Sequence, residues 1–116
     1  MPEIFQAASH DDSPQTFPVV KSTELEWEDG GAPGFWLKML HKDQETGART
    51  LLMKVDPGAF ADTHAHDQTE QVYVLEGSFY DQTQTYRVGD HVVRQPGAGH
   101  ATGSTEGAVT LLVYGP

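Results

Sequence analysis

The stretch that decides the fold begins Gly58-Ala59-Phe60-Ala61-Asp62-Thr63-His64-Ala65-His66-Asp67-Gln68-Thr69-Glu70 and is closed by Gly77. His64 and His66 are two positions apart, so on a β-strand their side chains project from the same face. The three residues before Glu70 have the composition of a turn, and a hairpin there would bring Glu70 beside both imidazoles on the adjoining strand. Two imidazoles and a carboxylate are ligands that a borderline divalent metal ion accepts. The stretch therefore predicts a metal site carried by short strands.

A fourth candidate ligand is His100, which follows the rigid turn Pro96-Gly97-Ala98-Gly99 and begins another short strand. For Glu70 a second interpretation stays open, in which its carboxylate accepts a hydrogen bond from a ligand histidine instead of binding the ion. We expect ordinary roles for the other histidines: His10 in solvent, His41 at an edge or in a hydrogen-bonded strand position, and His91 facing away from the ligands.

The rest of the chain has the pattern of an all-β protein. Glycine and proline turns separate short runs rich in β-branched and aromatic residues, and no stretch after residue 34 keeps a helical apolar period over two turns. We expect a small antiparallel β-barrel over residues 35–116, preceded by an extended N-terminal arm and lead-in over residues 1–34. The expected strands are Phe35–His41, Arg49–Val55, Glu70–Leu75, Ser78–Asp81, Thr85–Val88, His91–Gln95 and Ala108–Tyr114.

Composition narrows the functional classes. The 116 residues suit one domain, and seven Lys and Arg against seventeen Asp and Glu give a net charge of −10. This charge argues against nucleic acids and anionic membrane surfaces as partners, and no apolar run approaches a membrane-spanning length. The N-terminus shows no secretory signal, so we expect a cytoplasmic protein. Because the chain has no Cys, any metal must bind nitrogen and oxygen atoms.

Strand alternation separates an inner from an outer face. Val72 and Val74 share the parity of Glu70 and should point into the barrel, whereas Tyr73 and Leu75 should point outward. We expect that outer face to be covered by the arm or by a second subunit, and we therefore predict a homodimer. No cluster of arginines predicts a phosphorylated-sugar ligand. The predicted walls of a pocket for a small-molecule substrate are Trp36, Met53, Phe60, Val72 and Leu112.

These motifs resemble those of the cupin superfamily. Residues 58–77 match the first cupin motif, G-x5-HxH-x3,4-E-x6-G, at every fixed position. Residues 89–104 match the second motif, G-x5-P-x-G-x2-H-x3-N, more loosely, since Pro96 comes one residue late and Ser104 replaces the final Asn. The resemblance implies a double-stranded β-helix, or jelly roll, with one divalent metal ion per chain. The metal ligands that it implies are His64, His66, Glu70 and His100.

A narrower resemblance is to the ChrR-like cupin group. It rests on the segments Pro33-Gly34-Phe35-Trp36-Leu37-Lys38, Val74-Leu75-Glu76-Gly77-Ser78-Phe79 and Pro96-Gly97-Ala98-Gly99-His100. That group includes the zinc-binding cupin half of an anti-sigma factor and non-haem iron dioxygenases that cleave acetylacetone or 2,4'-dihydroxyacetophenone. No helical anti-sigma segment precedes the expected barrel, so we expect no transcriptional regulation by that route.

The resemblance implies three possible functions. We favour a dioxygenase that cleaves a carbon–carbon bond of a small diketone or hydroxyketone, with no catalytic group apart from the metal ligands. The alternatives are a zinc-binding sensor or binding module without turnover, and a metal-dependent isomerase or lyase. Fe(II) and Zn(II) are the metals that the resemblance favours, with Mn and Ni as further candidates.

Overall fold

The protein is almost entirely β-structure, as the sequence predicts. The computed structural model describes residues 4–7 and 16–115, and these contain nine strands, one turn of 3-10 helix (η1, Ser22–Glu24) and no α-helix. The strands are β1 (Glu28–Asp29), β2 (Phe35–Lys42), β3 (Arg49–Val55), β4 (Phe60–His64), β5 (Thr69–Tyr80), β6 (Thr85–Arg87), β7 (His91–Arg94), β8 (His100–Gly103) and β9 (Ala108–Gly115).

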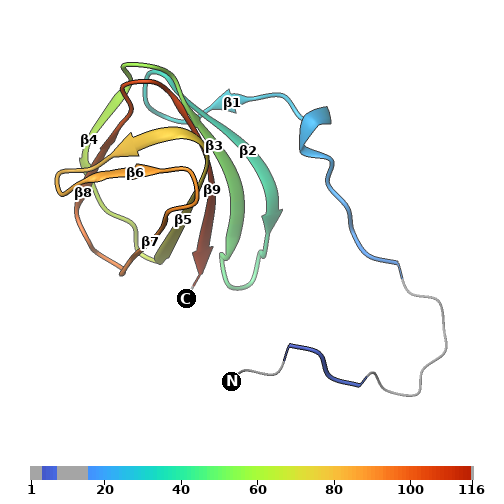
Figure 1. Ribbon diagram of the computed structural model, residues 1–116. Coiled ribbons are helices and arrows are strands. Elements are labelled where there is room, and N and C mark those ends of the chain that lie inside the picture. The colour runs from blue at the N-terminus through green and yellow to red at the C-terminus, as the bar shows by residue number, and fades with distance from the viewer. Residues whose placement is uncertain (1–3, 8–15, 116) are drawn as a thin grey trace.

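The strands form one antiparallel sheet that curls into an open barrel (Figure 1). Its order is β1-β2-β3-β9-β5-β8-β4, and β6 and β7 also pair with β5. The first part of β5 pairs with β9 and β7, and its last residues pair with β6 and β8. β5 therefore runs through both walls of the barrel, and the walls face each other across the interior.

A glycine allows β5 to pass from one wall to the other. The sequence predicts two strands, Glu70–Leu75 and Ser78–Asp81, but the structure has one strand with a register shift between Val74 and Glu76. Gly77 follows the shift with a φ of +68°, and a Cβ at that position would lie 1.9 Å from the carbonyl oxygen of Gly107. Gly77, which the sequence predicts to be in a turn, therefore lies at a bend within one strand. The strand continues because a β-bulge allows its backbone hydrogen bonds to form on both sides of the bend.

The connection between β4 and β5 also differs from the prediction. β4 pairs with β8, not with β5, so the segment between His64 and Glu70 crosses between the two walls and does not close a hairpin. Glu70 still approaches the histidines, but from the opposite wall. The composition of a turn does not show whether the chain forms a hairpin there or crosses to the other wall. The outcome depends on which strands, distant in the sequence, pair with the strands before and after the turn.

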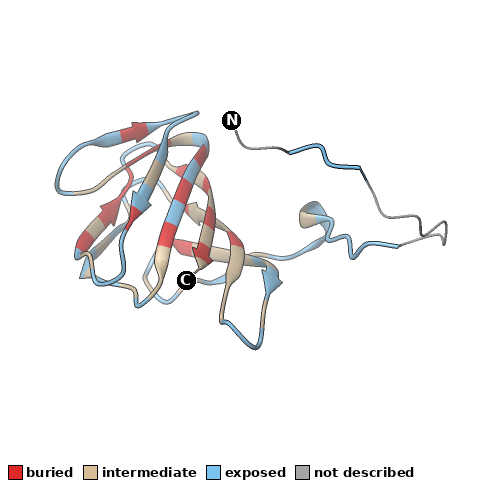
Figure 2. Cartoon of the chain, turned by 90° about the horizontal axis from the view of Figure 1, so that it is seen from below, coloured by how far each residue is buried: buried red, intermediate tan, exposed pale blue. Residues whose placement is uncertain are grey.

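The core is built from inward-facing residues in register across one wall. Leu51, Leu112 and Val72 lie side by side on β3, β9 and β5, and each is at most 3% exposed. The alternation of buried and exposed residues along these strands is visible in Figure 2. Val74 is buried and Tyr73 and Leu75 are exposed, which confirms the predicted inner and outer faces.

The N-terminal segment extends away from the barrel (Figure 1). Phe17 and Val19 are 75% and 76% exposed, so these apolar residues have no cover. The lead-in is fixed where Lys38 Nζ on β2 donates a hydrogen bond to the Ser22 carbonyl at 2.8 Å and lies 4.6 Å from the Trp27 ring centroid. His10, which we expect to be in solvent, lies outside the described residues. Within the described residues, no helix is long and apolar enough to cross a membrane.

Candidate metal centre

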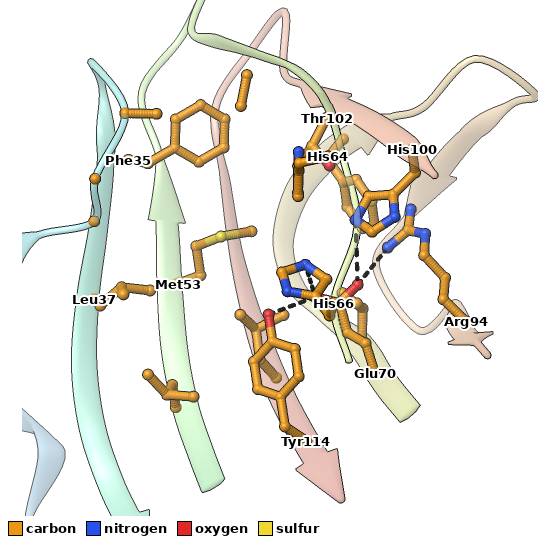
Figure 3. A pocket seen from close by; sticks show the side chains of 18 of the residues that line it. Phe35, Leu37, Met53, His64, His66, Glu70, Arg94, His100, Thr102 and Tyr114 are labelled. Carbon is orange, nitrogen blue, oxygen red and sulfur yellow. Dashed lines mark hydrogen bonds and ion pairs between the residues drawn. The ribbon is translucent and has the colours of Figure 1, made fainter. Parts of the chain in front are cut away.

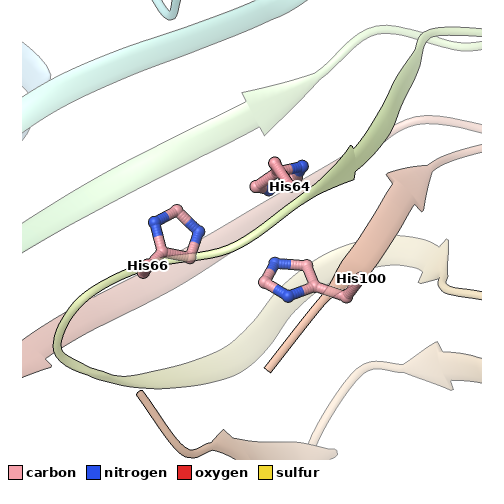
Figure 4. Close-up of side chains that lie close together, drawn as sticks. All are labelled: His64, His66 and His100. Atoms are coloured by element: carbon pink, nitrogen blue, oxygen red, sulfur yellow. The ribbon is translucent and has the colours of Figure 1, made fainter. Parts of the chain in front are cut away.

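Three histidines meet inside the barrel. His64 ends β4, His66 lies two residues further on, and His100 begins β8, where it is the register partner of His64 (Figure 4). One ring nitrogen from each histidine lies within 4.8 Å of the other two. The cross-strand pairing of β4 with β8 therefore brings together two motifs that are more than thirty residues apart in the sequence.

Backbone carbonyls fix the protonation of two of these rings. His64 Nδ1 lies 2.8 Å from the Asp62 carbonyl oxygen, and His100 Nδ1 lies 3.1 Å from the Ala98 carbonyl oxygen. A carbonyl oxygen only accepts hydrogen bonds, so Nδ1 carries the proton in both rings. The lone pair is then on Nε2, which is the arrangement of a metal-binding histidine whose orientation is held by its other nitrogen.

The third ring has a buried nitrogen without a hydrogen bond. His66 Nε2 is inaccessible to solvent and makes no hydrogen bond of good geometry, although it lies 3.3 Å from Glu70 Oε2. Burial lowers the pKa of His66 and also that of His100, which favours the neutral rings that metals bind. Three converging imidazoles, one of them with an unsatisfied buried nitrogen, fit a divalent metal ion.

Glu70 contacts this cluster from β5. Its side chain is 5% exposed, and its Oε1 lies 3.6 Å from His100 Nε2. Arg94 Nη1 donates to Oε1 at 2.8 Å, and the Tyr114 hydroxyl donates to Oε2 at 2.5 Å (Figure 3). Each carboxylate oxygen thus already accepts a hydrogen bond. The structure brings together three histidines that could hold a metal ion, and coordination by Glu70 stays a prediction.

Arg94 and Tyr114 are site residues that the sequence reasoning missed. They flank Glu70 because Arg94 on β7 and Tyr114 on β9 are both its register partners. Burial raises the pKa of Tyr114, and the Glu70 charge raises it further, so the phenol remains a hydrogen-bond donor. Both residues lie on strands that the sequence predicts, but only the strand order places them beside Glu70.

A second carboxylate holds the far side of Arg94. Arg94 Nη2 donates to Asp81 Oδ2 at 3.0 Å, and that oxygen also accepts from the Tyr86 hydroxyl at 2.7 Å. Burial acts to raise the pKa of Asp81, but hydrogen bonds from Thr83, Tyr86 and Arg94 outweigh it and hold the pKa well below its ordinary value. The buried guanidinium is therefore held between two carboxylates, which keeps it in a fixed position beside Glu70.

The histidines open into a cavity of about 580 Å³. Four of the predicted walls line it: Met53, Phe60, Val72 and Leu112. Phe35 and Leu37 add apolar surface opposite the histidines (Figure 3). The cavity therefore has a polar end, which includes the three histidines and Glu70, and an apolar side formed by residues such as Phe35, Leu37 and Met53.

Trp36, the fifth predicted wall, does not line this cavity. Its neighbours on β2, Phe35 and Leu37, both do, so strand alternation turns Trp36 to the outer face. There its Nε1 donates to Asp56 Oδ2 at 3.1 Å. Two histidines also stay out of the site: His41 is exposed, and His91 faces away from the ligands and lies 3.0 Å from Gln71 Oε1.

The curled antiparallel sheet and the histidine cluster facing its interior are those of a cupin. The chain belongs to the ChrR cupin-like domain family, which matches residues 15–116. No curated protein matches the chain.

Among the solved structures with the same fold are the following three. KdgF from Halomonas sp. is 22% identical with a TM-score of 0.74, over 87% of this chain and 94% of that one. A candidate acetylacetone dioxygenase from Methylibium petroleiphilum is 16% identical with a TM-score of 0.76, over 88% and 78%. The complex of SigE with the anti-sigma ChrR from Rhodobacter sphaeroides matches at 22% identity and a TM-score of 0.69, over 81% of this chain and 50% of that one. Similarity at this level shows the fold.

Proposed function

We propose that this cupin is a metal-dependent enzyme that cleaves a carbon–carbon bond of a small diketone or hydroxyketone with dioxygen. The observation that supports the proposal is the position of the three histidines at one end of a cavity whose opposite side is apolar. A ketone of a few carbon atoms fits such a cavity with its oxygens toward the histidines and its carbon skeleton against apolar walls.

The chain would supply the ion's ligands and its surroundings. His64, His66 and His100 would hold the ion, and a bound divalent ion, iron in particular, supplies Lewis acidity and reactivity toward dioxygen. Met53, Phe60 and Leu112 would place apolar surface against the carbon atoms of the ketone. Glu70, held by Arg94 and Tyr114, places a negative charge beside the histidines and stabilises a cation bound there.

Oxygen uptake tests this proposal. Metal-free protein reconstituted with Fe(II) should consume dioxygen when acetylacetone or 2,4'-dihydroxyacetophenone is added, and the same protein loaded with Zn(II) should not. A His100→Ala variant treated identically is the matched control, because it keeps the cavity walls and lacks one ligand. Iron-loaded protein that consumes no dioxygen with any diketone or hydroxyketone would refute the oxygenase proposal.

A second candidate function is a zinc-binding module without turnover. It is favoured by the proximity of Glu70 to His66 and His100, since three histidines and one carboxylate can close a four-coordinate zinc site. An isomerase or lyase would use the same ligands without dioxygen. A diketone that binds the zinc protein without being converted supports the module, and conversion without oxygen supports the isomerase or lyase.

We also propose that the chain forms a homodimer through the outer face of the wall that contains β9. Outward positions on β9 are Val109, Leu111 and Val113, which alternate with buried residues. In the neighbouring strands Leu111 pairs with Leu52 on β3 and with Tyr73 on β5, and Tyr73 is 43% exposed. An apolar patch that crosses three adjacent strands is typical of a protein interface.

The charges beside this patch favour a second copy as its partner. Val109 lies between Lys54 on β3 and Glu76 on β5 in one register row. A two-fold axis parallel to β9 would place Lys54 of each copy over Glu76 of the other and bring the two apolar centres together. This is the self-complementary pattern of an isologous interface.

A further inference from the structure

A row of polar side chains crosses the wall of the barrel at the metal end of the cavity. Arg49 on β3, Tyr114 on β9, Glu70 on β5 and Arg94 on β7 are successive register partners. All four line the cavity. Two positions further along β3, the next row of inward-facing register partners is apolar and consists of Leu51, Leu112, Val72 and Val92. The polar row is therefore limited to one end of the wall.

The two arginines of this row differ in how their charges are neutralised. Arg94 is 9% exposed and is paired with Glu70 and Asp81. Arg49 is half-buried, and among residues 4–7 and 16–115 no carboxylate lies within 4.0 Å of its guanidinium. Its Cζ lies 4.5 Å from the Tyr114 ring centroid, so the guanidinium stacks on the ring that also donates to Glu70. In a protein of net charge −10, Arg49 is an unpaired cation facing the cavity.

Stacking on Tyr114 orients the guanidinium without using its N–H donors. The Tyr114 ring centroid lies 5.1 Å from the His66 ring centroid, so Arg49 and one of the clustered histidines both lie beside the same aromatic ring. A planar guanidinium with free donors is the group that binds a carboxylate through two parallel hydrogen bonds. The other charged group of the lining without an ion pair, Asp62, is an acid on the opposite wall, where it would repel such a carboxylate.

We propose that Arg49 binds a carboxylate of the substrate, so that the site takes an anionic ketone, such as a dioxo-carboxylate, in preference to a neutral diketone. This inference rests on the proposed function, since it assumes that the ketone oxygens face the histidines. The carboxylate lies on Arg49, and the remaining carbon atoms face the apolar rows.

A matched pair of ligands tests the inference by binding alone. Acetylacetone and acetopyruvate share a β-diketone, and the second has a carboxylate in place of a methyl group. Each is titrated under nitrogen into Co(II)-loaded protein, and the dissociation constant is read from the visible absorption of the cobalt. Acetopyruvate should bind the wild type more tightly, and in Arg49→Met the ratio of the two constants should fall about tenfold. Arg49→Lys should restore part of the ratio.

Controls separate the contribution of Arg49 from general effects of charge. Lys42→Met removes one positive charge from the register partner of Arg49 on β2, outside the cavity lining, and should leave the ratio unchanged within twofold. A wild-type ratio that persists in Arg49→Met overturns the inference and leaves the diketone site intact. If the cobalt-loaded wild type binds neither ligand, the proposed function falls together with the inference.

Discussion

Tyr114 and Arg94 determine where the Glu70 carboxylate lies, since each donates a hydrogen bond to one of its oxygens. All three side chains are buried, so the loss of one hydrogen bond leaves a polar atom without a partner or lets the carboxylate rotate. The position of Glu70 relative to His66 and His100 thus depends on residues outside the histidine cluster.

Tyr114→Phe tests this dependence. The variant keeps the aromatic ring and removes the hydrogen-bond donor to Glu70 Oε2. We therefore expect the affinity for Zn(II) to fall about tenfold, which is at the low end of the losses seen when a residue that orients a metal ligand is replaced. Competition with a chromogenic chelator measures the affinity. Tyr86→Phe is the control, because its hydroxyl binds Asp81 and not Glu70. Equal zinc affinities for wild type and Tyr114→Phe would show that the hydroxyl does not position Glu70.

Asp81 predicts a specific pH dependence of stability. Its pKa is lowered in the folded protein, so ionised Asp81 stabilises the fold above the unfolded pKa near 3.9, and that stability is lost as the pH falls toward the folded pKa. At pH 7, Asp81→Asn should lower the free energy of unfolding by about 2 kcal/mol, and the deficit should shrink below pH 3. Urea unfolding at several pH values measures it. A deficit that is constant with pH would contradict this account.

Residue spacing alone identified much of the candidate site. The full interval from Gly58 to Gly77, which matches the first cupin motif, and the turn before His100 picked out the three histidines that the structure brings together. Arg94, Tyr114 and Arg49 carry no such local signal. Each is a single side chain near the end of a strand. Its position in the site can be recognised only from the strand pairing, which places it in the same register row as Glu70.

At the scale of elements, the bend of β5 at Gly77 joins the two walls. Gly77→Ala should cost more than about 3 kcal/mol, because the new Cβ meets the Gly107 carbonyl at 1.9 Å in addition to the strain of a positive φ. Gly89→Ala is the matched control: its φ is +91° but a Cβ there contacts nothing, so about 1 kcal/mol is expected. Thermal unfolding compares them, and equal losses would contradict the close contact at Gly77.

The strand pattern was largely predictable, and the connections were not. Runs such as Arg49–Val55 agree with β3 because alternation and turn residues are local properties. The single β5 and the crossing from β4 to β5 depend on pairing with β8 and β9, which come later in the chain. Trp36 was misplaced for a related reason: its aromatic character suggested a pocket wall, whereas its parity on β2 turns it outward.

At the scale of the whole molecule, the apolar outer face predicts self-association. Leu111→Glu places a charge at the centre of the proposed interface, and we expect it to convert a dimer into a monomer without loss of the metal site, because Leu111 faces away from the cavity. Sedimentation velocity measures the mass. Val88→Glu, at a residue that is 62% exposed between β6 and β7, should remain dimeric. A monomeric wild type at about 100 μM, or a dimeric Leu111→Glu, would contradict the interface.

We predict that His64, His66 and His100, which lie close enough together to hold a metal ion, bind one divalent ion per chain. The most direct measurement is the metal content of protein expressed with iron, zinc, manganese and nickel all available, determined by elemental analysis after gel filtration. We predict close to one equivalent of transition metal per chain in the wild type and almost none in a folded His66→Ala variant. A metal-free wild type, or a full equivalent of metal retained by His66→Ala, would contradict the account.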